Sequence, residues 1–154
     1  MNIYTGCYNK CKSGNLISIS FDKGEDAGFE GKTMTELAPF KDFFHIWKDN
    51  IGKISEEENT RYYIEQYYNK VLSKVNIMSL LEKEENPILL CYEDSEEFCH
   101  RHVLAEYINI KYGILVQEIE INEELEITIK KRPKNIRPIL EQVLRSEKFK
   151  SLSV

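Results

Sequence analysis

No run of apolar residues in this sequence comes near the roughly 20 that a membrane-spanning helix needs. Residues 1–12 lack the basic and then apolar layout of a secretory signal peptide. Internal repeats, linkers and low-complexity tracts are also absent. We therefore expect a single cytoplasmic domain over residues 1–154, a length sufficient to bury a core of its own, with no membrane partner.

Cysteine is scarce, and its four residues are Cys7, Cys11, Cys91 and Cys99. In a cytoplasmic protein we expect reduced thiols, metal ligands or core residues, and disulfides least of all. Zinc sites usually use closer pairs such as Cys-x2-Cys, whereas the spacings here are Cys-x3-Cys and Cys-x7-Cys. The sequence therefore predicts no metal and no cofactor.

An excess of positive charge is missing as well. The net charge is -5, which argues against a protein whose whole surface binds nucleic acid. Basic residues gather between Lys130 and Lys150, a segment with a charge of +6, and the remainder carries -11. This segment could bind nucleic acid, but a solvated helix face is the simpler interpretation and the one we favour.

The hydrophobic periodicity predicts an α/β fold. The apolar run 87–92 does not alternate, which is typical of a strand buried on both faces of a parallel sheet. The Gly-rich stretch 22–34 is predicted to be a long functional loop. Further strands are expected at 2–7, 16–21, 114–119 and, at an edge, 126–130, and helices at 40–48, 56–74, 77–81, 95–113 and 136–149. This order predicts an open, mainly parallel sheet with helices on both faces, a Rossmann-like three-layer arrangement.

Reactive side chains gather where strand 87–92 leads into the next helix. Cys91 ends the strand, and Cys99, His100 and Arg101 fall in the first turns of the helix, with Asp94 or Ser95 expected as its cap. Ligands of open α/β sheets bind outside the carboxyl ends of strands, and helix N-termini favour anions.

Each of these residues could take part in chemistry. A helix N-terminus and nearby cations stabilise a thiolate at Cys99. His100 or His102 can transfer a proton near neutral pH, and Arg101 suits phosphate or carboxylate. Structural roles remain open beside these: Cys91 as a small core residue, His100 as a hydrogen-bonded core histidine, and Arg101 as a partner of Glu97 four residues earlier.

The same residues carry a family resemblance. Cys91-Tyr92-Glu93, followed by the block 98–106 (Phe-Cys-His-Arg-His-Val-Leu-Ala-Glu), resembles the signature of domain of unknown function 488. Supporting likenesses lie at 3–5, 17–20, 31–32, 37–39 and 67–74, so the resemblance covers about residues 1–120 and leaves 121–154 as a C-terminal strand and basic helix. It implies an α/β fold with a central sheet and supplies no activity. In the family the second strand usually ends in Arg, where this chain has Phe21, so Lys23 is the expected substitute.

These observations lead to one expected site. A small anionic, nucleotide-like ligand should bind at the Cys-His-Arg junction, whether or not it is transformed. The expected catalytic residues are Cys99, His100 and Glu93, and the expected ligand-binding residues are Arg101, Tyr4, Ser20, Lys23, Cys91 and Tyr92. A non-catalytic module that holds a ligand or a protein is the alternative, with nucleic-acid binding the weakest, and a homo-oligomer is left open.

Overall fold

A single six-stranded sheet organises the fold in the computed structural model, which describes residues 1–152 and the side chains of residues 1–147. The strand order is β3-β2-β4-β1-β5-β6, and every neighbouring pair is parallel except β5 and β6. The strands are β1 (Ile3–Cys7), β2 (Asn15–Ser18), β3 (Lys32–Thr33), β4 (Pro87–Cys91), β5 (Val116–Ile121) and β6 (Ile127–Lys130). The open, mainly parallel α/β sheet is confirmed.

Strand β4 occupies an inner position between β2 and β1. All five of its residues are buried, as its unbroken apolar run predicts. It pairs with β1 in a register that sets Cys91 opposite Cys7, and with β2 so that Leu90 lies opposite Ser18. The carboxyl ends of β1, β2 and β4 therefore meet at one edge of the sheet.

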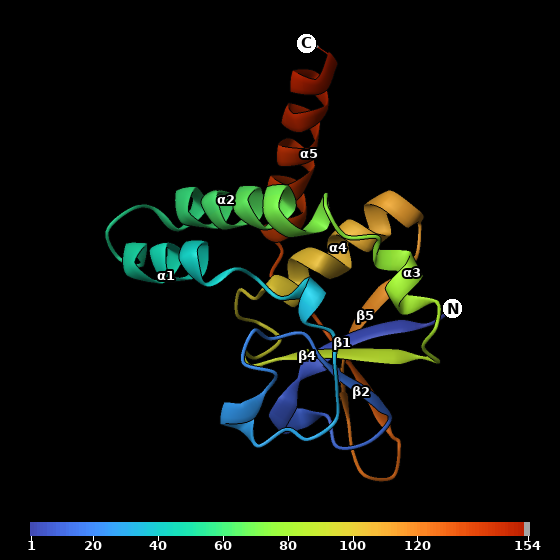
Figure 1. The fold of residues 1–154 in the computed structure, drawn as a ribbon. Coiled ribbons are helices and arrows are strands. Elements are labelled where there is room, and N and C mark those ends of the chain that lie inside the picture. Colours follow the sequence, from blue (N-terminus) through green and yellow to red (C-terminus); the bar gives the residue numbers. More distant parts are fainter. Residues whose placement is uncertain (153–154) are drawn as a thin grey trace.

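The two faces of the sheet are covered differently. Figure 1 shows the α-helices gathered on one side of the sheet. The other side has a small apolar cluster around Leu90 and Ile119, against which Tyr8 and Phe29 pack from loops that contain short 3-10 turns. The α-helices are α1 (Lys41–Asn50), α2 (Glu56–Tyr67), α3 (Ile77–Leu81), α4 (His100–Tyr112) and α5 (Ile136–Leu152).

Helix α2 begins at Glu56, as predicted, and its N-cap residue Ser55 accepts a hydrogen bond at Oγ from the Glu58 N–H at 3.1 Å. Its apolar stripe enters the main core, with Tyr63 and Tyr67 at most 2% exposed. These two tyrosines are therefore core residues. After Tyr67 the chain continues as one π-helical turn.

The helix predicted to start at Asp94 or Ser95 begins later, at His100, with Cys99 as its N-cap. The Asp94 N–H donates to the Glu97 carboxylate at 3.4 Å, so this capping-box pair closes an isolated turn before the helix. The predicted loop 22–34 also contains the two-residue edge strand β3.

None of the helices in the described part of the chain, residues 1–152, has both the length and the apolar character to span a membrane. The cytoplasmic location stays a prediction.

Replacing Tyr67 with Phe should lower the free energy of unfolding by about 1–3 kcal/mol, since the buried Leu37 carbonyl loses the 2.6 Å hydrogen bond from the Tyr67 hydroxyl. Urea denaturation of the two proteins measures the change. Tyr62→Phe is the control in the same helix, because the half-buried Tyr62 hydroxyl has no hydrogen bond within residues 1–147. Equal effects of the two substitutions would contradict the assignment.

Candidate functional site

A pocket of about 460 Å³ opens at the carboxyl ends of β2 and β4. Cys91, Glu93 and His100 line it, and they come from the end of β4, the loop that follows and the first turn of α4. The other lining residues are Ser20, Phe21, Asp22, Asp26, Pro39, Phe44, Lys48 and Tyr92. The pocket lies where ligands bind in open α/β sheets.

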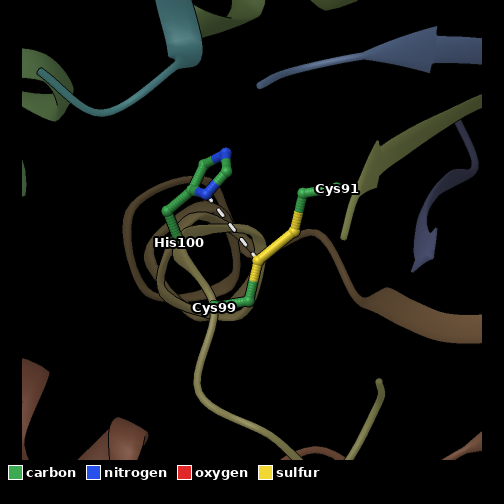
Figure 2. A group of neighbouring side chains, drawn as sticks. All are labelled: Cys91, Cys99 and His100. Carbon is green, nitrogen blue, oxygen red and sulfur yellow. Dashed lines mark hydrogen bonds between the residues drawn. A yellow bond between two sulfur atoms is a disulfide. The ribbon is translucent and has the colours of Figure 1, made fainter. Parts of the chain in front are cut away.

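The structure joins Cys91 and Cys99 in a disulfide (Figure 2). This corrects the expectation that disulfides are the least favoured state of the cysteines. The loop 92–98 folds back on itself, so the N-cap of α4 returns to the end of β4 and the two buried sulfurs meet. Cys99 is 3% exposed and does not line the pocket, whereas Cys91 does.

The contacts of its two ring nitrogens hold His100 in one orientation. Nε2 lies 2.8 Å from the Ile19 carbonyl oxygen, which can only accept, so Nε2 carries the proton. Nδ1 is then left with its lone pair, 3.7 Å from Cys99 Sγ (Figure 2). Burial lowers the pKa of His100 to about 4, so the ring is neutral at pH 7. His100 is thus a hydrogen-bonded core histidine that also faces the pocket.

Three acidic residues, Asp22, Asp26 and Glu93, are part of the pocket lining. The Tyr92 hydroxyl donates to Asp22 and accepts from the Asp26 N–H at 3.1 Å. Glu93 Oε2 lies 3.6 Å from Cys91 Sγ, and burial raises the pKa of this carboxyl. A carboxyl with a raised pKa beside a sulfur can exchange a proton at a pH closer to neutral than an exposed Glu can.

Arg101 does not reach the pocket, since its side chain is completely buried. Its Nε and Nη2 donate to the two oxygens of Glu118 at 3.1 and 2.7 Å, and its Nη1 donates to Cys91 Sγ at 2.9 Å. The structure therefore pairs Arg101 with Glu118 and not with Glu97. Arg101 therefore donates a hydrogen bond to a sulfur of the disulfide and is not among the described residues that line the pocket.

Glu118 is the main residue that sequence reasoning missed. Its carboxylate also accepts hydrogen bonds from Thr5 and Ser95, both at 2.7 Å. Burial alone would raise the pKa of Glu118, but the hydrogen bonds and charge of Arg101 outweigh it and hold the value at about 2. One signal in the sequence could have indicated its burial. Glu118 lies two residues after the apolar Val116, so both side chains point to the helix-covered face of β5.

The remaining predicted residues divide into two groups. Ser20 lines the pocket, and its Oγ accepts a hydrogen bond from the Tyr8 hydroxyl at 2.8 Å. Tyr4 lines a separate hollow of about 630 Å³ together with Ile88, and Lys23 lies outside the described pocket lining. The structure thus brings Ser20, Cys91, Tyr92, Glu93 and His100 together and leaves Tyr4, Lys23, Cys99 and Arg101 off the pocket wall.

The other two cysteines are free and buried. Cys7 Sγ donates to Asn9 at 3.1 Å, and Cys11 packs in the small cluster on the opposite face of the sheet. Burial raises the pKa of Cys11 to about 12, so this thiol stays protonated. Cys11 is therefore an inert core residue and a suitable control for experiments on the other cysteines.

Replacing Glu118 with Gln should lower the free energy of unfolding at pH 7 by about 3–5 kcal/mol, because it leaves the buried charge of Arg101 without its negative counter-charge. The stabilisation by Glu118 is fully present above the ordinary carboxyl pKa of about 4.3 and is lost as the pH falls toward the folded value of about 2. Urea denaturation from pH 7 down to pH 2.5 measures both effects.

Glu120→Gln on the same strand is the matched control for Glu118→Gln. Among the side chains of residues 1–147, Glu120 makes only surface ion pairs, to Lys10 at 3.6 Å and Lys130 at 3.8 Å, so its loss should cost at most about 1 kcal/mol. A Glu118→Gln protein as stable as this control would contradict the buried pair.

Comparison with known proteins identifies the sequence family of the chain. No curated protein and no solved structure matches the chain. A protein-family model described as the active DUF488-N3 subclade matches residues 21–112, which include β4, the disulfide loop and all of α4. Since this match spans more than half of the sequence, the chain belongs to the DUF488 family.

Proposed function

We propose that the protein binds a small molecule in the pocket beside the Cys91–Cys99 pair and acts on it chemically. The observation that carries this proposal is the convergence of Cys91, Glu93 and His100 on one cavity. A sulfur, a carboxyl with a raised pKa and a neutral imidazole are groups that form bonds and move protons. The turn between β4 and α4 brings all three groups to the wall of one cavity.

The charge of the pocket favours a neutral or cationic ligand over an anionic one. Asp22, Asp26 and Glu93 contribute carboxyl groups, against the single amine of Lys48 among the described lining residues. Arg101, which the sequence indicates as the anion-binding group, is already neutralised by Glu118. We therefore revise the expected ligand from an anion to a molecule that donates hydrogen bonds to carboxylates.

The walls of the pocket suit a planar ring. Phe21 and Phe44 meet edge to face with their centroids 5.4 Å apart, and Tyr92 completes the aromatic lining. Aromatic side chains bind flat rings by stacking, and a volume of about 460 Å³ is within the range of small-molecule sites. A nucleoside without phosphate combines a flat ring, hydrogen-bond donors and a suitable size.

A non-catalytic binding module is the second candidate, and the disulfide favours it. With Cys91 and Cys99 joined, neither sulfur is a thiolate nucleophile. The two candidates differ in one outcome: incubation with nucleosides under reducing conditions gives a product of changed mass only if the protein is an enzyme.

Nucleic-acid binding through the basic C-terminal segment finds less support. Lys130, Arg132 and Arg137 each lie within 4 Å of a carboxylate of the chain, so these cations are partly neutralised. The side chains of Lys148 and Lys150 lie outside the described residues.

Calorimetric titration with the four ribonucleosides and their 5′-monophosphates tests the proposed ligand class. At least one nucleoside should bind, and its monophosphate should bind more weakly, because the added negative charge meets Asp22, Asp26 and Glu93. Glu93→Gln should weaken nucleoside binding by about 10-fold, the effect of losing one charge-assisted hydrogen bond.

Glu123→Gln, in the exposed turn between β5 and β6, is the control and should bind as the wild type does. Tighter binding of every monophosphate than of its nucleoside would overturn the charge argument. Absence of binding by all eight compounds would refute the nucleoside class.

A further inference from the structure

We propose that the reduced protein binds one divalent metal ion of the zinc type through Cys91, Cys99 and His100. This inference deepens the proposed function, on which its chemical use depends, by naming the centre that would act on the ligand. Metal binding itself is measured without any ligand, so the failure of one proposal can be told from the failure of the other.

The three donor atoms already lie together. The sulfurs of Cys91 and Cys99 and a ring nitrogen of His100 lie within 4.8 Å of one another (Figure 2). Around a tetrahedral zinc ion with ordinary bond lengths, a sulfur and a nitrogen are about 3.6 Å apart. The observed distance from Cys99 Sγ to His100 Nδ1 is 3.7 Å. This pair needs almost no rearrangement to become two ligands.

The two sulfurs must separate once the disulfide is reduced, to about 3.8 Å for two thiolates on one tetrahedral ion. The Cα atoms of Cys91 and Cys99 are 7.6 Å apart, beyond the usual range of about 4.4–6.8 Å for a disulfide. Rotation of the side chains can therefore part the sulfurs without a shift of the backbone.

The imidazole is prepared for metal binding by its other nitrogen. A metal-bound histidine typically donates its second ring N–H to a carbonyl or carboxylate, which fixes the tautomer and the ring orientation. His100 Nε2 donates in this way to the Ile19 carbonyl at 2.8 Å. The free lone pair of Nδ1 then points toward Cys99 Sγ, on the side where the metal would lie.

A positively charged or positively polarised group lies beside each of the two cysteines. Arg101 Nη1 donates to Cys91 Sγ at 2.9 Å, and Cys99 occupies the N-cap position of the 13-residue helix α4, whose dipole favours negative charge. Two thiolates balance the charge of a divalent ion. Sulfur and nitrogen donors select zinc over magnesium or calcium.

The proposed site keeps one position open. Cys91 and His100 both line the pocket, so a fourth ligand would approach from the cavity. Three protein ligands with an open fourth position are the arrangement of catalytic zinc sites, whereas structural sites are closed. Glu93 lies beside this position, with Oε2 at 3.6 Å from Cys91 Sγ.

The experiment uses the full chain, reduced with a phosphine, freed of metal by a chelator and titrated with Co²⁺ and with Zn²⁺. The wild type should bind one ion per chain by native mass spectrometry. Bound Co²⁺ should show the visible absorption of a tetrahedral ion and a near-ultraviolet thiolate band. Cys91→Ser and Cys99→Ser should each weaken metal binding by at least about 100-fold. Loss of a hydrogen-bond partner of a ligand costs up to about 100-fold in affinity, and loss of the ligand itself should cost no less.

Cys11→Ser is the control, because Cys11 lies on the opposite face of the sheet, and it should bind metal as the wild type does. If Cys91→Ser or Cys99→Ser fails to fold, the wild-type Co²⁺ spectrum decides, since a thiolate band requires sulfur ligands. Adding imidazole to the Co²⁺ protein should shift its visible bands if the fourth position is open. A reduced wild type that binds neither ion at micromolar concentration, or Cys91→Ser and Cys99→Ser variants that bind as tightly as Cys11→Ser, would overturn the proposal.

Discussion

The buried ion pair between Arg101 and Glu118 is the interaction on which the site depends. It ties the first turn of α4 to the middle of β5, and the third guanidinium nitrogen reaches back to the sulfur at the end of β4. Burying two charges is costly, and a hydrophobic pair of the same volume would often be as stable. We infer that the main effect of the pair is to position helix α4 against the sheet. It fixes the direction in which α4 leaves the sheet, and so it fixes the place of Cys99 and His100.

Much of the fold could be predicted from the sequence because local patterns determine it. The apolar run of β4, the Ser55 cap of α2 and the left-handed Gly113 after α4 each reflect forces within a few residues, and the predicted strand at β4, the start of α2 and the end of α4 agree with the structure. The start of α4 could not be found in this way. Asp94 and Glu97 form a valid capping pair, yet the turn they close stops short of the helix. The path of the chain after it is set by contacts with distant strands, which local pattern does not encode.

The site was predictable in place and less so in chemistry. The sequence places reactive groups at the end of β4, and the pocket lies there. It could not show that the Arg101 side chain points into the core. The residue that neutralises Arg101 is Glu118, which lies 17 residues further along the chain, in strand β5. Nor could it show that Cys91 and Cys99 meet, because a separation of eight residues fits a loop that folds back as well as one that extends. Side-chain direction depends on tertiary partners, and these decide which charge a ligand encounters.

The strand order has a kinetic consequence. β4 enters the sheet between β1 and β2, which precede it by some 80 and 70 residues, and β5 then completes the other side of β1. The first half of the chain therefore contains only the short β2–β3 ladder as sheet structure of its own. Pairing between distant segments is slow because loop closure opposes it. During synthesis, the edges of β1 and β2 that face β4 therefore stay unpaired until the chain has grown past residue 91.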